Sequence, residues 1–175
     1  MKYDRSGWRK PKEIDNFKSE LEFITARWLS KLKIPYIYEP KTYKTKRGNY
    51  TPDFLLPETN IFIECKPNFK FVKEHVLRFK QFCLEQKSNL LIVTKDKLYC
   101  MEYASFEKEE NVLFEEEDET LIVNCRKCGV ISFCTQIGFW HCRKCDNHEG
   151  DHDCTTATDY FSIFYKKVKE NDKKR

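Results

Sequence analysis

Apolar and polar positions between residues 17 and 103 follow the periods of helices and short strands. Five apolar residues recur at spacings of four, three, four and four, which places them on one helical face: Phe17, Leu21, Ile24, Trp28 and Leu32. Ser19 and Glu22 have the spacing of a capping box, so they mark the start of this helix. Pro35 marks its end. A second helix is predicted over Val72–Gln86.

Short runs typical of strands fill the rest of this region. They are Tyr36–Glu39, Asn49–Leu56, Ile61–Lys66, Leu90–Thr94 and Lys97–Tyr103. The turn-forming residues Pro57–Asn60 separate the second run from the third, which favours a hairpin at this point. Together the runs predict an α/β fold in which a mixed central sheet carries helices on its faces.

The basic stretch Lys41–Arg47 lies among four tyrosines, at positions 36, 38, 43 and 50. Aromatic rings among lysines can stack on bases while the lysines bind phosphates. The plainer interpretation is that the tyrosines pack in strands and the basic residues form a solvated loop. The pattern slightly favours the plainer interpretation.

Two neighbouring strands bring charged side chains to one end of the predicted sheet. Glu64 and Lys66 leave the same face of an otherwise apolar strand, because strand side chains alternate. Asp53 lies on the preceding strand and can reach the same end. Carboxylates suit a magnesium ion, and a lysine beside them can stabilise negative charge in a reaction. An exposed hairpin with an incidental Glu–Lys pair is the alternative, but the apolar surroundings of these charges disfavour it.

These residues resemble a known nuclease superfamily. The pattern of Pro-Asp, ten residues and Glu-x-Lys is that of the PD-(D/E)xK nucleases, and the closer resemblance is to the phage endonuclease I group of Holliday-junction-resolving enzymes. The resemblance covers residues 17–100 and depends on three segments: Phe17-x-Ser19-x-Leu21-Glu22, Tyr50–Pro57 (YTPDFLLP) and Ile61–Lys66 (IFIECK). It implies a fold of the restriction-endonuclease type.

The resemblance also implies an activity and a site. The chain would be a magnesium- or manganese-dependent DNA endonuclease that leaves 5′-phosphate and 3′-hydroxyl ends and works as a homodimer on duplex or branched DNA. Asp53, Glu64, Glu22 and the backbone carbonyl of Cys65 would bind the metal, and Lys66 would be catalytic. Glu22 has an alternative role as the capping partner of Ser19. A phage or mobile-element origin fits the same resemblance.

The cysteines near the C-terminus have the spacing of a zinc site. Two C-x2-C pairs are separated by thirteen residues: Cys125, Cys128, Cys142 and Cys145. This arrangement predicts a zinc ribbon with a structural zinc, since four thiolates leave no position for water. A second metal held by Cys134, His148, His152 or Cys154 stays open, although a polar loop is favoured there. Cys83 and Cys100 are predicted in the core.

Basic residues inside the two cysteine pairs have two interpretations of equal weight. They are Arg126, Lys127, Arg143 and Lys144. They would contact DNA phosphates, or they are solvent-exposed positions with no partner.

Composition and charge divide the chain further. Nine cysteines are an odd number, which argues against a complete disulfide set.

The N-terminus has no signal-like apolar region and no run is long enough to span a membrane, so a cytoplasmic protein of a bacterial or phage-infected cell is expected. Residues 1–104 carry 21 basic and 13 acidic side chains, whereas residues 105–120 carry one basic and eight acidic. The basic balance of residues 1–104 weakly suggests a polyanionic partner.

The predicted organisation has five parts: a basic arm (1–16), a nuclease domain (17–104), an acidic linker (105–120), a zinc ribbon (121–165) and a flexible basic tail (166–175). The competing functional hypothesis is a non-catalytic module, in which the zinc ribbon binds nucleic acid and the nuclease fold is a relic. RNA cleavage is a third hypothesis.

Overall fold

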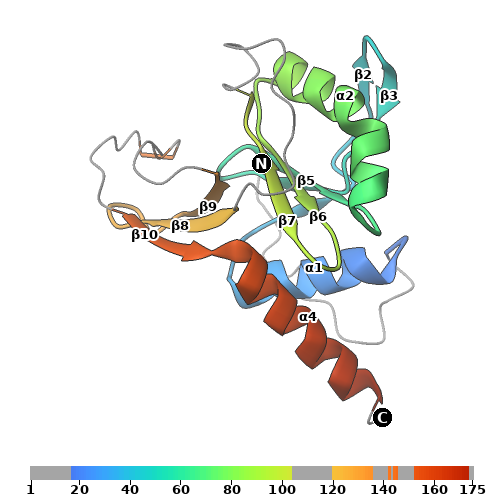
Figure 1. The fold of residues 1–175 in the computed structure, drawn as a ribbon. Coiled ribbons are helices and arrows are strands. Elements are labelled where there is room, and N and C mark those ends of the chain that lie inside the picture. The colour runs from blue at the N-terminus through green and yellow to red at the C-terminus, as the bar shows by residue number, and fades with distance from the viewer. Residues whose placement is uncertain (1–16, 104–119, 136–141, 143, 146–151, 174–175) are drawn as a thin grey trace.

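The computed structural model describes residues 17–103, 120–135, 142, 144–145 and 152–173. The predicted basic arm and all but the last residue of the predicted acidic linker lie outside these ranges. These residues contain three helices and ten strands, and the strands form one large sheet and two small ones (Figure 1).

The large sheet has five strands, in the spatial order β1, β4, β5, β6, β7. Their bounds are β1 (Ile37–Tyr38), β4 (Phe54–Leu56), β5 (Ile61–Cys65), β6 (Leu90–Val93) and β7 (Leu98–Met101). Strands β5 and β6 are parallel and the other neighbours are antiparallel. The parallel pair needs a long crossover, which helix α2 (Phe69–Gln86) provides. The prediction of an α/β fold with a mixed sheet is confirmed.

Helix α1 (Glu20–Lys31) covers one face of the sheet, and its predicted start is confirmed. The Ser19 hydroxyl accepts a hydrogen bond from the backbone N–H of Glu22 at 3.2 Å, so Ser19 is the N-cap. Trp28 and Leu29 are completely buried in the core cluster that also contains Ile63 of β5. The amphipathic pattern therefore positions the helix.

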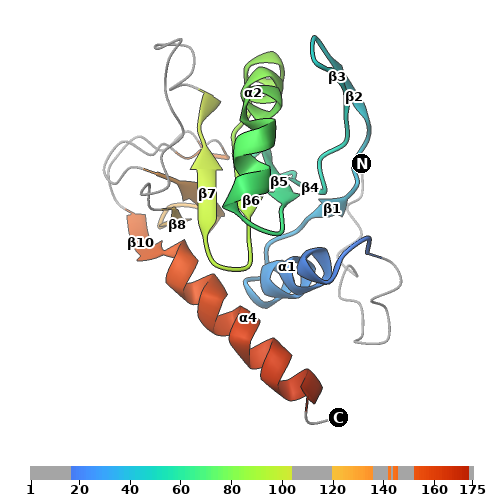
Figure 2. The same ribbon diagram turned by 45° about the vertical axis from the view of Figure 1, so that its right-hand side comes forward.

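Helix α2 covers the opposite face (Figure 2). It begins three residues earlier than the predicted Val72, because the Asn68 side chain accepts hydrogen bonds from the backbone of the first turn. The alternation predicted for β5 is confirmed. Ile61 and Ile63 belong to the core under α1, whereas Phe62 belongs to the core under α2.

The segment predicted as a single strand over Asn49–Leu56 is two strands. Strand β3 (Gly48–Tyr50) pairs with β2 (Tyr43–Thr45) in a separate hairpin, and β4 pairs with β1 and β5. Pro52 lies at the break, since proline has no N–H to donate and restricts the residue before it. The predicted loop is therefore a β-hairpin, which Gly48 closes at φ 97°.

The packing interpretation is confirmed for two tyrosines of this hairpin. The rings of Tyr43 and Tyr50 lie 5.2 and 4.6 Å from the ring of Phe82 on α2. The hairpin thus lies against α2 rather than free in solvent.

The cysteine-containing segment forms a three-stranded antiparallel sheet. Its spatial order is β10 (His152–Thr156), β8 (Leu121–Cys125) and β9 (Ile131–Cys134). Helix α4 (Ala157–Lys173) follows β10 directly. The prediction of a flexible tail from residue 166 is wrong, because α4 continues through that point and buries Val168 in the core under α1.

The cysteine-containing segment and the α/β sheet share one apolar core. The ring of Trp28 lies 5.6 Å from Phe133 of β9 and 5.0 Å from Phe161 of α4. Hydrogen bonds also cross this boundary, since the backbone N–H and the hydroxyl of Thr135 donate to Glu102 at 2.8 and 2.9 Å. Helices α1 and α4 therefore lie together on one side of the large sheet (Figures 1 and 2).

Candidate functional site

The register of β4 and β5 places Asp53 and Glu64 at the same end of the sheet. Phe54 pairs with Ile63 in this antiparallel ladder, so the residues beyond that pair are Asp53 and Glu64. One carboxylate oxygen of Asp53 accepts a hydrogen bond from the backbone N–H of Cys65 at 2.7 Å. The two predicted carboxylates are thus brought together by backbone pairing.

Glu64 is 5% exposed and has a partner on each oxygen. Its Oε2 accepts a hydrogen bond from the Tyr50 hydroxyl at 2.7 Å, and its Oε1 lies 2.5 Å from Nζ of Lys66. The Lys66 ammonium also lies 5.9 Å from the centre of the Phe79 ring on α2. The predicted pair of Glu64 and Lys66 therefore meets at the end of β5.

Glu22 is 6% exposed and is held by donors from two elements. Its Oε1 accepts from the Ser19 hydroxyl at 2.8 Å, while its Oε2 accepts from the Tyr38 hydroxyl at 2.6 Å. Tyr38 is in position because β1 pairs with β4. The capping contact with Ser19 is present, and the metal-binding role of Glu22 stays a prediction, as does that of the Cys65 carbonyl.

The carboxylates influence each other electrostatically. Burial, the negative charge of Glu64 and that of Glu22 raise the pKa of Asp53 to about 8, although the N–H of Cys65 and the Lys66 charge oppose this. Burial and the Glu64 charge raise the pKa of Tyr50, and burial and the hydrogen bond to Glu22 raise that of Tyr38. Both tyrosines are therefore neutral hydrogen-bond donors to the carboxylates.

The three carboxylates do not form a tight group of ligand atoms. Among the described residues, only four cysteines bring three or more potential metal-ligating side chains close together. Each carboxylate instead accepts hydrogen bonds from donors of its own, as described above. Of the three carboxylates, Asp53 has a raised pKa, so a positive charge placed beside it would favour its ionised form.

This site predicts a pH dependence of stability in buffer without divalent cations. Asp53 ionises near pH 3.8 when unfolded but near 8 when folded. The folded state therefore binds more protons in this window, and stability falls as pH rises, with a limiting slope of about 1.4 kcal/mol per pH unit. Urea denaturation at several pH values measures this slope. The free energy of unfolding should fall less steeply with pH in Asp53→Asn than in the wild type, since the other titratable groups contribute equally in the two proteins. Parallel curves would contradict the raised pKa.

The four predicted cysteines meet in one cluster, as the spacing predicted. All four sulfur atoms lie within 4.8 Å of one another, with 3.7 Å between Cys125 and Cys145 and 3.5 Å between Cys128 and Cys142. A zinc ion bound at ~2.3 Å needs a tetrahedron of sulfurs with edges of about 3.8 Å. The cluster could therefore hold zinc.

The backbone of the first cysteine pair supports this cluster. Gly129 adopts φ 69° and its N–H donates to the carbonyl of Cys125 at 2.7 Å. Burial acts to raise the pKa of Cys125, but hydrogen bonds from the backbone of Cys128 and Lys127 and from the side chains of Cys128 and Cys142 together lower that pKa to about 6. A thiolate is the form that binds metal.

The basic residues predicted to contact DNA have intramolecular partners where they are described. Arg126 lies 2.8 Å from the Asp153 carboxylate, and Lys144 lies 2.7 Å from Glu58. Lys127 is exposed, and Arg143 lies outside the described residues. Two of the four predicted contacts are therefore occupied within the protein.

No second metal cluster is found among the described residues. Cys134 is buried and Cys154 is exposed, while His148 and the side chain of His152 lie outside the described part. Cys83 and Cys100 are buried, which confirms their predicted place in the core.

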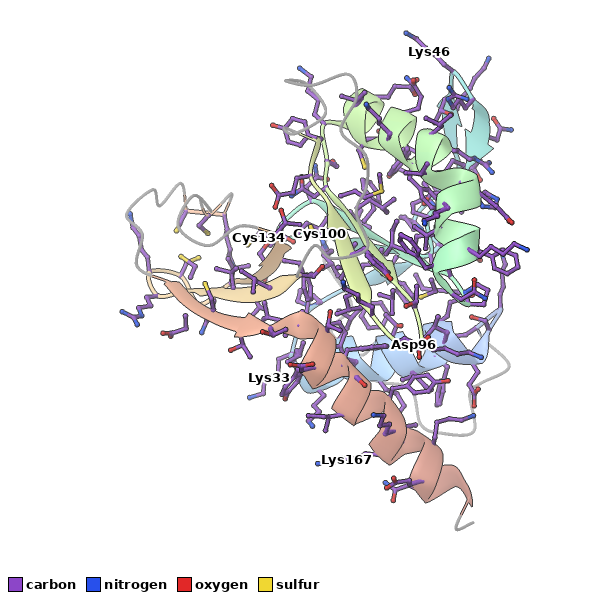
Figure 3. All side chains as sticks on the ribbon, viewed as in Figure 1. Lys33, Lys46, Asp96, Cys100, Cys134 and Lys167 are labelled. Atoms are coloured by element: carbon purple, nitrogen blue, oxygen red, sulfur yellow. The ribbon has the colours of Figure 1, made fainter. Side chains whose placement is uncertain are left out.

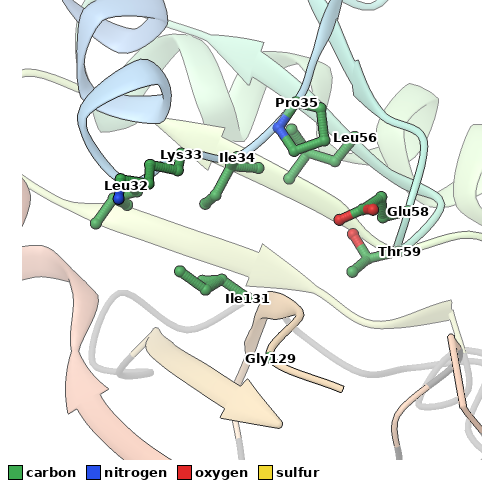
Figure 4. A pocket seen from close by; sticks show the side chains of 9 residues that line it. All are labelled: Leu32, Lys33, Ile34, Pro35, Leu56, Glu58, Thr59, Gly129 and Ile131. Carbon is green, nitrogen blue, oxygen red and sulfur yellow. The ribbon is translucent and has the colours of Figure 1, made fainter. Parts of the chain in front are cut away.

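A pocket of about 190 Å³ lies at the boundary between the large sheet and the cysteine-containing segment (Figure 4). Its lining includes Ile34 after α1, Glu58 and Thr59 in the turn between β4 and β5, and Ile131 of β9. That turn is at the opposite end of β4 and β5 from Asp53 and Glu64. The pocket is therefore separate from the carboxylate site.

Comparisons with protein-family models, with curated proteins and with solved structures find no match for this chain. None of the helices in the described part is long and apolar enough to cross a bilayer.

Proposed function

We propose that the chain is a metal-dependent endonuclease that hydrolyses phosphodiester bonds in DNA. The observation that carries this proposal is the meeting of Asp53, Glu64 and Lys66 at one end of β4 and β5, with the pKa of Asp53 raised to about 8. Buried carboxylates whose mutual repulsion raises a pKa are typical of functional sites, and a bound cation would relieve that repulsion. The resemblance to PD-(D/E)xK nucleases gives these three residues their roles.

Each side chain has a proposed task. Asp53, Glu64, Glu22 and the Cys65 carbonyl would hold magnesium or manganese, which when bound supplies charge neutralisation for the phosphodiester and for an attacking water. Lys66 would orient the water and stabilise negative charge on the phosphate oxygens. The hydroxyl of Tyr50 keeps Glu64 in place through its 2.7 Å hydrogen bond. The products would carry 5′-phosphate and 3′-hydroxyl ends.

Finer features of the proposal come from the resemblance alone. They are a fold of the restriction-endonuclease type, action as a homodimer and a preference for branched DNA. The arrangement of the mixed sheet, with α2 connecting the parallel strands β5 and β6, is compatible with that fold. Zinc in the cysteine cluster would be structural, because the four sulfurs leave no open ligand position.

The test is a cleavage assay on a panel of substrates in magnesium or manganese. Four-way junctions, linear duplex and single-stranded DNA are offered at equal concentration, with Asp53→Asn as the inactive reference. We expect metal-dependent cutting by the wild type and none by Asp53→Asn, because the substitution removes a metal-binding charge. Paired nicks across the junction would support a resolving enzyme, whereas cutting of all duplexes would support a nuclease without branch selectivity.

Two outcomes would contradict the proposal. Binding of DNA without cleavage, by folded and zinc-loaded protein, would favour the non-catalytic module on a relic fold. Faster cleavage of matched RNA would favour a ribonuclease.

A further inference from the structure

We propose that the hairpin of β2 and β3 is a duplex-DNA-binding element that holds one side of the substrate beside the carboxylate site. This inference rests on the proposed function for the identity of the site, but DNA binding by the hairpin is testable without any cleavage. We call residues 41–50 the basic hairpin. They contain four basic residues and no acidic one: Lys41, Lys44, Lys46 and Arg47.

The backbone of the basic hairpin sorts its side chains onto two faces. Tyr43 pairs with Tyr50 across the strands, and both rings turn inward against Phe82 of α2. Lys44 pairs with Asn49 at the next position, so both point outward, and both are exposed. The outer face is therefore polar and cationic, while the inner face anchors the hairpin.

The tip is fixed as well as charged. The backbone N–H of Lys46 donates to the Glu85 carboxylate of α2 at 3.1 Å, and Arg78 of α2 donates to the carbonyl of Asn49. A preorganised surface loses little conformational entropy on binding. Figure 3 shows Lys46 at the end of the hairpin, far from Lys167 on α4.

The tip side chains pair with no acidic side chain among the described residues. In the part of the chain that the structure describes, the side chains of Lys44, Lys46 and Arg47 are exposed and form no ion pair with a carboxylate. Arg126 and Lys144, by contrast, are already paired with Asp153 and Glu58. Two of the four basic residues in the cysteine pairs are thus engaged by carboxylates, whereas the three exposed ones of the hairpin are available to phosphates.

The base of the basic hairpin is part of the carboxylate site. Tyr50 ends β3 and donates its hydroxyl hydrogen bond to Glu64, which contacts Lys66. Arg47 lies three positions before Tyr50, a distance of about 10 Å along a strand. A duplex whose backbone crosses the site would therefore meet the hairpin tip within about three phosphates, given a spacing of roughly 3.4 Å per base pair.

The shape of the element favours duplex DNA over duplex RNA. The major groove of B-form DNA admits a two-stranded β-ribbon, and Lys and Asn are side chains that hydrogen-bond base edges there. The major groove of A-form RNA is too deep and narrow for such a ribbon. Asn49 on the outer face matches the first case, while Lys44 and Lys46 would contact the phosphates that line the groove.

The test measures binding of a short fluorescent duplex by anisotropy over salt concentrations from about 50 to about 200 mM. All proteins carry Asp53→Asn and the buffer contains no divalent cation, so cleavage plays no part. Lys44→Ala/Lys46→Ala should lower the slope of log K against log salt by about 2, one for each lost phosphate contact. Lys166→Ala/Lys167→Ala removes the same charge from α4 and should leave the slope unchanged.

Equal slopes for the two double variants would overturn the inference, whatever the parent protein cleaves. Equal binding of duplex RNA, with the same dependence on Lys44 and Lys46, would overturn the assignment to DNA. A reduced slope in a protein whose wild type never cleaves DNA would instead support the hairpin and contradict the proposed nuclease.

Discussion

Lys66→Ala is expected to lower the rate of metal-dependent DNA cleavage by about 10²–10³-fold, the usual effect of removing one group that stabilises transition-state charge. The Lys66 ammonium lies 2.5 Å from Glu64, at the end of β5 where Asp53 also reaches. The fold should be retained, because the Lys66 backbone N–H still donates to the carbonyl of Val93 at 2.8 Å. Single-turnover cleavage of plasmid DNA would measure the loss.

A control variant and a metal-binding measurement distinguish a loss of catalysis from a loss of structure in this experiment. Lys167→Ala removes an exposed lysine from α4 and should cleave at the wild-type rate. Calorimetric titration with manganese should show binding retained in Lys66→Ala and weakened in Asp53→Asn. Wild-type cleavage by Lys66→Ala would remove Lys66 from the mechanism, and loss of manganese binding would assign it a role in holding the carboxylates.

Cys128→Ser is expected to abolish stoichiometric zinc binding and to destabilise the whole chain. Zinc would bind the cysteines only in their folded arrangement, so its binding free energy contributes directly to folding of the core that β9 and α4 share with α1. A loss of about 4 kcal/mol, near the upper end for a single substitution, lowers Tm by roughly 8–16 °C in a chain of this length. Zinc content by mass spectrometry and thermal melting would measure the two effects.

The matched control is Cys154→Ser, because Cys154 is exposed on β10 and outside the four-cysteine cluster. It should retain zinc and melt as the wild type does. Trp28 reports the structural consequence, since Phe133 and Phe161 lie against its ring. In a background without Trp8 and Trp140, emission in Cys128→Ser should shift to longer wavelength. Normal zinc content in Cys128→Ser would contradict the predicted ligand set.

Local patterns predicted most of the large sheet. The spacing of apolar residues and the Ser19 cap identified α1, and alternation along β5 identified which side chains share a face of the sheet. These features depend on residues within one element or on the adjacent strand. The four-cysteine cluster was predictable for the same reason, because each C-x2-C pair lies on one turn.

Features that depend on distant contacts were not predictable in this way. The basic hairpin forms because Phe82 of α2 receives Tyr43 and Tyr50, which lie more than thirty positions away in the sequence. The C-terminal residues read as a flexible tail because their lysines dominate the composition, yet Val168 packs under α1. Burial against a remote element overrides local composition.

In the candidate site, the sequence identified the charged residues but not the groups that hold them. Tyr38 and Tyr50 donate hydrogen bonds to Glu22 and Glu64, and both were interpreted as packing residues of strands. Tyr50 precedes Thr51-Pro52-Asp53 directly, so its proximity to the site was visible in the sequence. Its hydrogen bond was not, because it depends on how β3 separates from β4.

The position of Trp28 makes this chain indivisible in practice. A fragment that ended before residue 120 would leave one side of α1 without Phe133, Phe161 and Val168, and water would reach a face built to be dry. Such a fragment would associate with itself rather than stay monomeric. The segments before and after residue 120 therefore cannot be transferred to another protein separately. A substitution at Trp28 would require compensating substitutions on β9 and α4.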